Sequence, residues 1–210
     1  MYSSFALVVC AASAVMTFAA CSSDKTTPSA NTSSGSASTP AFTEAVSPAS
    51  PEPATANSTC PTAAPANGVA PEWTLTGATG SVAVTGSTDT AAPRVEVTAP
   101  FSVTQTEVHT LHAGDGPVVA PTAKVSVCYM GVNGRDGQVF DSAYQRGAPV
   151  DFPLDGVVPG FQKAIAGQKV GSTVGVAMTS ADGYPDGQAA AGIQKGDTLV
   201  FAIKILSVSS

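Results

Sequence analysis

Apolar and polar residues alternate in short runs along the second half of the chain, and this period of two is typical of half-buried β-strands. The runs lie at residues 106–112, 125–129, 174–178 and 199–205, with glycine-containing turns between them. Short runs joined by turns predict antiparallel strands. Together with one short helix, they predict an α+β fold in which a curved antiparallel β-sheet wraps the helix.

A further strand and the helix are predicted between residues 139 and 165. Val150, Phe152 and Leu154 alternate with polar or conformationally special residues, as in a half-buried strand. Pro159 suits the start of a helix, because the first N–H groups of a helix have no internal partner. The residues after it have the i, i+3, i+4 spacing of one helix face: Phe161, Ala164 and Ile165.

A short β-rich extension is predicted at residues 71–105, before this domain. Its residues alternate around 73–75, 81–85 and 94–97, and glycines separate the first of these runs. Trp73 is the only tryptophan of the chain. It could stack on a ligand, but we favour an anchor that packs the extension onto the domain.

Residues 5–20 form an apolar stretch that ends in small residues just before Cys21. Its length suits a secretory signal peptide better than a membrane-spanning helix. The small residues before Cys21 are similar to a bacterial lipoprotein signal, in which the thiol is lipidated and the cysteine becomes the first mature residue. Residues 1–4 lack Lys and Arg, so plain secretion is the alternative. We expect an extracytoplasmic protein, anchored to the outer face of the bacterial cell membrane by a lipid on Cys21.

The stretch that follows, residues 22–59, is almost entirely Ser, Thr, Ala and Pro. Such a segment cannot bury enough apolar surface to offset its chain entropy, so we expect a disordered tether. We therefore divide the chain into a signal peptide at 1–20, the lipidated cysteine and disordered linker at 21–70, the β-rich extension at 71–105 and the folded domain at 106–210.

Charged residues make up only 11% of the chain, and the net charge is −6. A phosphate backbone needs clustered Lys and Arg, so this composition argues against nucleic acid as a partner. The only histidines, His109 and His112, have no cysteine or carboxylate cluster at metal-ligand spacing. We interpret them as strand-surface residues and expect no metal.

Two of the four cysteines are candidates for a disulfide. Cys10 lies in the predicted signal peptide and Cys21 at the lipidation site, which leaves Cys60 and Cys128 as an even pair in an oxidising compartment. Alternation places Cys128 on the opposite strand face from Tyr129. A disulfide would then join the N-terminal extension to the back of the sheet, and two free thiols are the alternative.

Five segments have a distinctive order and spacing: YMG at Tyr129–Gly131, FDSAYQRG at Phe140–Gly147, VVPGFQKAIAGQKVG at Val157–Gly171, Tyr184, and DTLVFAIKIL at Asp197–Leu206. Together they resemble the FKBP family of peptidyl-prolyl cis/trans isomerases. The resemblance depends on all of the segments in this order and spacing, and not on any one of them. The resemblance covers roughly residues 108–208, about half of the chain.

The resemblance implies catalysis without a covalent step and without a cofactor. Rotation about an X–Pro bond has a barrier of about 18–20 kcal/mol, which reflects amide resonance. A dry apolar pocket favours the twisted state, because water no longer stabilises the planar dipole. Such an enzyme must bind the twisted state better than either planar state.

The family pattern also implies a role for individual residues of this chain. Tyr184 would donate its hydroxyl to a substrate carbonyl, and the Val158 N–H would bind a second carbonyl. Arg146 would hold Asp141 in a buried ion pair, with the carboxylate near the twisting amide. Ile193 would cover the pocket edge. The rim would be formed by Val150 and Val157, and the walls and floor by Tyr129, Phe140, Val158, Phe161 and Phe201.

Three features depart from the family pattern. The floor position, often Trp, is Phe161, and we expect it to accept proline but to bind macrolides such as rapamycin more weakly. A rim position that is often aromatic is Val150. The loop after Tyr184 has small residues at 189–192, and these leave the preferred residue before proline undetermined.

We expect a monomeric prolyl isomerase that acts on proline-containing exported polypeptides, with macrolides as candidate inhibitors. One alternative is a non-catalytic FKBP-like binding module or chaperone of the cell envelope. Another is an envelope interaction protein in which residues 73–101 carry the interaction. The aromatic residues could also be ordinary core, but their register with Tyr129 and Tyr184 favours a pocket.

Overall fold

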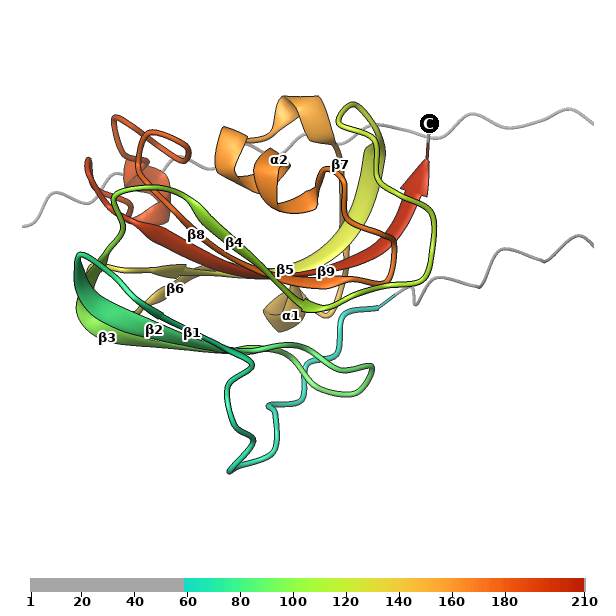
Figure 1. Cartoon of the computed structure of the whole chain (residues 1–210), viewed down its shortest axis with the longest axis horizontal. Helices are drawn as coiled ribbons and strands as arrows, with labels where there is room; N and C mark the ends of the chain where they lie inside the picture. The colour runs from blue at the N-terminus through green and yellow to red at the C-terminus, as the bar shows by residue number, and fades with distance from the viewer. Residues whose placement is uncertain (1–58, 210) are drawn as a thin grey trace, which may run out of the picture. The chain divides into compact units, whose positions relative to one another are not determined.

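The computed structural model describes residues 59–209, and most of them belong to one antiparallel sheet and its coverings (Figure 1). The main sheet has the strand order β4-β8-β9-β5-β6, and β7 also pairs with β5. Each run that we predicted from residue 106 onward is a strand, and the prediction of an α+β fold with a curved sheet around a short helix is confirmed. The strands are β4 (Glu107–His112), β5 (Lys124–Asn133), β6 (Val139–Ser142), β7 (Val150–Pro153), β8 (Thr173–Met178) and β9 (Leu199–Ser209).

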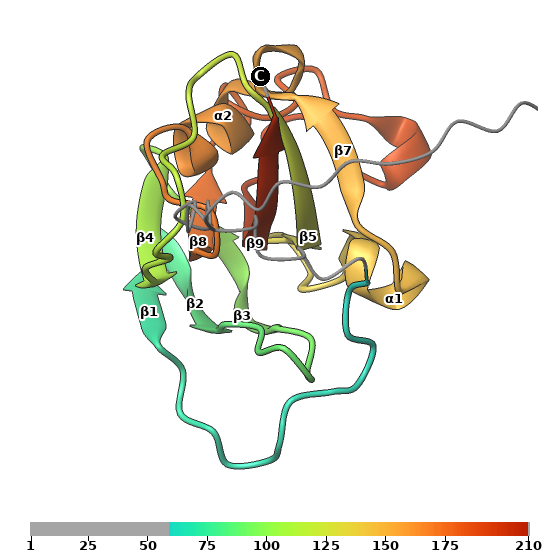
Figure 2. The same cartoon turned by 90° about the vertical axis from the view of Figure 1, so that its right-hand side faces the viewer.

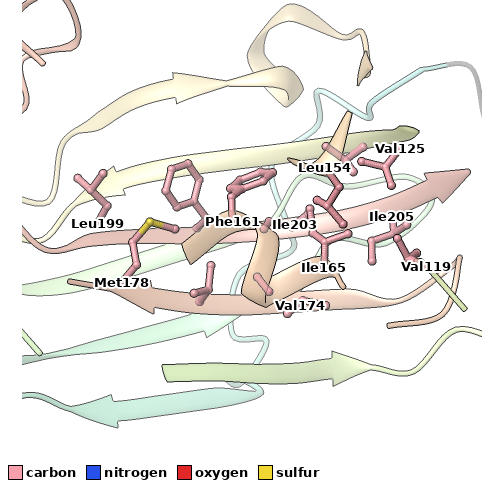
Figure 3. Close-up of a cluster of buried hydrophobic side chains, with 14 of the residues drawn as sticks. Val119, Val125, Leu154, Phe161, Ile165, Val174, Met178, Leu199, Ile203 and Ile205 are labelled. Atoms are coloured by element: carbon pink, nitrogen blue, oxygen red, sulfur yellow. The ribbon is translucent and has the colours of Figure 1, made fainter. Parts of the chain in front are cut away.

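Helix α2 (Pro159–Ile165) lies over one face of this sheet (Figures 1 and 2). Its apolar side chains Phe161, Ala164 and Ile165 are at most 5% exposed, and burying a large one stabilises a fold by about 1.5–3 kcal/mol. The helix can approach β8 because Gly160 has no side chain: a Cβ there would lie 2.8 Å from Met178 Sδ. Figure 3 shows Phe161 and Ile165 among other core residues, which include Val119, Val125, Leu154, Val174, Met178, Leu199, Ile203 and Ile205.

The β-rich extension forms a second sheet with the order β1-β2-β3. It lies against the face of the main sheet that is opposite α2 (Figures 1 and 2). Its apolar residues pack against the back of β8 and β9 in one buried cluster, formed by Val82, Val84, Phe101, Ala177, Val200 and Ala202. The extension is therefore a structural layer of the domain. Its strands are β1 (Trp73–Thr76), β2 (Thr79–Thr85) and β3 (Arg94–Ser102).

Trp73 joins the extension to the main sheet, which confirms the anchor interpretation. Its ring is stacked on the His109 ring of β4, with 5.7 Å between the ring centroids. It also lies over β8, where a Cβ on Gly175 would come within 2.7 Å of the Trp73 ring. His112, at the end of β4, has its Nδ1 3.6 Å from Glu72 Oε2. Both histidines thus lie on β4, at the edge of the main sheet.

Part of the segment assigned to the linker is bound to the domain. Cys60 forms a disulfide with Cys128, with 5.7 Å between the Cα atoms, and both residues are 1% exposed. The Cys60 N–H donates to the Gly147 carbonyl, and the Ala92 N–H donates to the Ala63 carbonyl. Low hydrophobicity predicted a free linker up to residue 70, but this covalent bond and these hydrogen bonds fix its last part.

The predicted signal peptide, Cys21 and most of the linker lie outside the described residues. Within 59–209, no helix is long and apolar enough to cross a membrane. The same part of the chain has no group of three His, Cys, Asp or Glu residues placed to hold a metal ion. Its remaining short elements are α1 (Ala143–Arg146) and the 3₁₀ turns Leu154–Gly156 and Ala189–Ala191.

Candidate active site

An open cavity of about 420 Å³ lies beside the outer edge of β5. This edge pairs with β7 along residues 124–127 and with β6 along residues 130–132. Between β6 and β7 the chain leaves the sheet and forms the single turn of α1. Side chains from β5, β6, β7, β9, α2 and the loop before β9 therefore converge on one space. It is lined by Tyr129, Phe140, Asp141, Val150, Phe152, Gly156, Val157, Val158, Phe161, Tyr184 and Phe201.

Aromatic rings in edge-to-face or tilted contact form the cavity wall. The Phe161 ring is central, with its centroid 5.7 Å from that of Tyr129, 5.5 Å from Phe152 and 5.2 Å from Phe201. Phe140 meets Phe201 edge-on at 5.5 Å. Aromatic pairs prefer this geometry, because the positive edge of one ring faces the negative face of the other. The rings thus hold one another in place and present an apolar surface.

Gly131 of β5 makes room for these rings. A Cβ at this position would lie 2.6 Å from Phe140 Cζ and 2.8 Å from Phe201 Cε1, well inside the contact distance of two carbon atoms. The glycine of the YMG segment therefore allows the aromatic rings to approach the β5 backbone.

One carboxylate at the cavity wall is held by two donors. The Tyr129 hydroxyl and the Arg146 Nη1 donate to the two oxygens of Asp141. Arg146 Nη2 also donates to the Tyr129 hydroxyl oxygen at 3.3 Å. The side chains of Asp141 and Arg146 are 39% and 48% exposed, so the ion pair is half-exposed rather than buried as we predicted. The strand-to-turn excursion that brings the two residues together also leaves them at the surface.

The neighbours of this carboxylate fix its protonation state. Burial by itself would raise the pKa of Asp141, but the hydrogen bonds from Tyr129 and Arg146 outweigh burial and lower it. Burial raises the pKa of Tyr129, and its hydrogen bond to Asp141 raises it further. At neutral pH the site therefore holds a fixed carboxylate beside a protonated phenol, and neither group is poised to exchange a proton.

The start of α2 supplies a backbone donor. Val158 is the N-cap of this helix, and its carbonyl accepts hydrogen bonds from Phe161 and Gln162. Its own N–H has no backbone acceptor within residues 59–209, as is usual at a helix start. Because Val158 also lines the cavity, this N–H is available to a carbonyl bound there.

Asp182 positions the loop that places Tyr184 at the cavity. Its carbonyl accepts from the Gly160 N–H at 2.8 Å. Its carboxylate accepts from Lys163 Nζ at 2.8 and 2.9 Å and from Thr106 Oγ1 at 2.5 Å. These partners lower the pKa of Asp182, with the Lys163 hydrogen bond as the main cause. The loop is thus tied to α2 and to the residue before β4.

Nine of the eleven predicted site residues line the cavity, all except Arg146 and Ile193. Arg146 is outside the lining and donates to Asp141. The Ile193 side chain is 4% exposed and packs into the main core instead of covering the pocket edge. It follows Gly192, which has a left-handed backbone and ends the short 3₁₀ turn.

Phe152 and Gly156 also line the cavity, although we did not predict them as site residues. Phe152 could have been predicted from the alternation of the strand, because it follows Val150 by two residues and must lie on the same strand face. Asp182 had no local signal, since its partners are distant in the sequence. None of the eleven lining residues is Ser, Cys, His or Lys, and most are aromatic or aliphatic, so the arrangement suits the binding of an apolar group.

Comparison with known proteins agrees with this class of site. Residues 116–206 match the family described as FKBP-type peptidyl-prolyl cis-trans isomerase. The chain is 37% identical over 95 residues to the "Probable FK506-binding protein" of Corynebacterium glutamicum, and the match covers 45% of this chain and 79% of that protein. The chain belongs to the FKBP-type peptidyl-prolyl cis-trans isomerase family.

Two other matches cover about half of this chain. The "FKBP-type 22 kDa peptidyl-prolyl cis-trans isomerase" of Escherichia coli is 37% identical over 98 residues, and this chain spans 47% of its length. A crystal structure of a peptidyl-prolyl cis-trans isomerase from Pseudomonas syringae is 29% identical, with a TM-score of 0.45, and the match covers 50% of this chain and 76% of that one.

Proposed function

We propose that this protein catalyses cis/trans isomerisation of X–Pro bonds in exported polypeptides. The observation that supports this most directly is the aromatic cavity itself, with a fixed carboxylate, a backbone N–H and a tyrosine on its wall. A volume of about 420 Å³ is within the range of small-molecule sites, roughly 300–1,000 Å³. It accommodates a proline ring together with its neighbouring amide.

The proposed mechanism rests on the polarity of the site. In the planar amide, resonance places negative charge on the carbonyl oxygen, and twisting the C–N bond removes it. The aromatic wall withholds the water that would stabilise the planar form. The Asp141 carboxylate near that oxygen also disfavours the planar form, because like charges repel. Each 1.36 kcal/mol removed from the barrier accelerates rotation about tenfold.

Two donors would hold the substrate in place while the bond rotates. The Val158 N–H and the Tyr184 hydroxyl are assigned to carbonyls on either side of the twisting bond. Because both belong to elements held by Asp182, their separation is preorganised. No covalent intermediate and no proton transfer are needed, which agrees with a carboxylate that Tyr129 and Arg146 hold in place.

The test is isomerisation of a series of X–Pro peptides by the full chain, followed by exchange NMR. Tyr184→Phe should lower kcat/KM about two- to tenfold, the worth of one neutral hydrogen bond. Asp141→Ala should lower it about ten- to hundredfold, because the charge that disfavours the planar form is lost and Tyr129 and Arg146 lose their charged acceptor. Val118→Ala, at a surface position that is 60% exposed, is the matched control. A folded wild-type protein without activity on any peptide would leave the cavity as a non-catalytic binding site.

We also propose that the protein is a lipoprotein of the outer face of the cell membrane, anchored through Cys21. The apolar stretch at 5–20 and the small residues before Cys21 support this proposal. The Cys60–Cys128 disulfide agrees with an oxidising compartment. Cys21→Ser should move the protein from the membrane fraction to the soluble fraction, and mass spectrometry should find the lipid only on the wild type. A wild-type protein without lipid would point to plain secretion.

A further inference from the structure

Arg146 belongs to an element that cannot hold itself in place. Helix α1 has only four residues, Ala143–Arg146, whereas isolated helices shorter than about 12–15 residues are marginal in water. Its internal support is one Ser142 cap, which accepts from the Gln145 N–H at 3.2 Å, and a left-handed Gly147 at its end. The position of Arg146 must therefore be set by contacts with other parts of the chain.

One such contact comes from Tyr144 in the same turn. Its side chain is 2% exposed, and its hydroxyl donates to Ser87 Oγ at 2.8 Å. Ser87 is itself 5% exposed and follows β2 of the extension. The buried ring also packs with Cys60, Ala92 and Cys128. The extension thus supports α1 on the face directed away from the cavity.

A second contact comes from Cys60, which reaches both members of the Tyr129–Arg146 pair. Its N–H donates to the carbonyl of Gly147 at 3.2 Å, and Gly147 directly follows Arg146. Its Sγ is bonded to Cys128, which directly precedes Tyr129. Covalent bonds and hydrogen bonds therefore close a small ring through Cys60, Cys128, Tyr129, Arg146 and Gly147.

We propose that Cys60 is a positioning residue, which acts through its disulfide to Cys128 and its hydrogen bond to Gly147 to keep Arg146 against Asp141 and Tyr129. Cys60 lies outside residues 116–206, which match the family, so the N-terminal segment of this chain completes its own active site. The inference rests on the isomerase function proposed above. A purely structural disulfide would instead stabilise the domain without influencing the carboxylate.

A double-mutant cycle separates these two roles. In the full chain, Cys60→Ala with Cys128→Ala should lower kcat/KM by roughly three- to tenfold, as expected for groups in one network. Arg146→Ala should lower it by at least as much. If Cys60 acts through Arg146, combining the three substitutions should have no effect beyond Arg146→Ala alone. Full additivity, or an unchanged kcat/KM without the disulfide, would overturn the proposal.

Two further variants distinguish a loss of positioning from a general loss of stability. Val84→Ala removes a fully buried side chain of the extension that belongs to the cluster behind β8 and β9 and not to the cluster of α1, and it should leave kcat/KM unchanged below the unfolding temperature. Tyr144→Phe removes only the hydroxyl that reaches Ser87 and keeps the ring. It replaces the cysteine variant if that variant does not fold, and its smaller loss should again vanish in the Arg146→Ala background.

A readout without substrate distinguishes failure of this inference from failure of the proposed function. The guanidinium of Arg146 donates to Asp141 and to Tyr129, so its ¹⁵N–¹H NMR signals should show restricted rotation in the wild type. Loss of the disulfide should average these signals, whereas Val84→Ala should not. Restricted signals in an inactive wild-type protein would reject only the isomerase function. Unchanged signals without the disulfide would reject the positioning role.

Discussion

Tyr129 and Asp141 illustrate how neighbours decide the properties of a residue. Both are side chains that water would solvate freely in an unfolded chain. In the folded domain the phenol becomes a half-buried donor and the carboxylate becomes its fixed acceptor. Neither residue needs an unusual backbone for this, because β5 and β6 pair Asp141 with Gly131, and Tyr129 lies two residues before Gly131 on β5.

At this scale Gly131→Ala should change the shape of the cavity without removing any of its polar groups. The new Cβ would lie 2.6 and 2.8 Å from the rings of Phe140 and Phe201, so both rings must move. Overpacking of this kind costs about 1–3 kcal/mol of unfolding free energy. We expect kcat/KM to fall about tenfold, measured with the best X–Pro peptide. Gly192→Ala, where no atom lies within 4 Å of the added Cβ, tests strain alone and should lower only stability.

The loss of activity at low pH should follow the protonation of Asp141. Its pKa is held below 3.8, so folding favours the carboxylate. This stabilisation is complete above the unfolded pKa, about 3.9, and is lost as the pH falls through the lower folded value. Activity should therefore be constant from about pH 5 to about pH 8 and fall only in stronger acid. Arg146→Ala should move this loss of activity to higher pH, and a loss that does not move would contradict the assignment.

Loops and short helices depend on neighbouring elements for their position. The loop with Tyr184 is tied to α2 and to the start of β4 by Asp182. Helix α1 is supported by the extension in the same way. Both elements hold site residues, and neither has a local sequence pattern strong enough to fix its own conformation.

Asp182→Asn should therefore loosen the Tyr184 loop. The substitution removes the ion pair with Lys163, whose partners are 20% and 56% exposed, and should cost at most about 1 kcal/mol of stability. KM should rise severalfold while the overall fold is retained, because Tyr184 spends less time at the cavity. Asp186→Asn in the same loop, where the side chain is 93% exposed, is the control and should leave KM unchanged.

Three layers stack within the described part of the chain: α2, the main sheet and the extension sheet (Figure 1). The extension covers the apolar back of β8 and β9, which would otherwise face water. A sheet with both faces apolar needs a covering on each side. The domain is therefore larger than residues 116–206, which match the family.

Removal of residues 71–105 should destabilise the domain rather than leave it unchanged. The back of β8 and β9 would become an exposed apolar patch, and such patches promote aggregation. A milder form of this test is Val84→Ala, which should lower the free energy of unfolding by about 1–3 kcal/mol. Urea unfolding followed by the fluorescence of Trp73 measures it. Val108→Ala, at a position 38% exposed, should change stability by less than about 0.5 kcal/mol.

Much of the fold could be predicted because strand and helix patterns repeat at short range. The alternation at 125–129, 174–178 and 199–205 identified three central strands, and the spacing of Phe161, Ala164 and Ile165 identified the buried face of α2. The cavity lining was largely predictable for the same reason, since alternation already decides which side chains share a face.

The sequence by itself determined the strands, the helix, the aromatic residues of the pocket other than Phe152, and the membership of Asp141 and Arg146 in one segment. Only the tertiary structure decided that their ion pair is half-exposed, that Ile193 turns into the core, and that Asp182 holds the Tyr184 loop. It also decided that Cys60 joins Cys128. The physical reason is the same in each case: these properties depend on groups far apart along the chain, whose distance is set by sheet pairing and packing rather than by any local period.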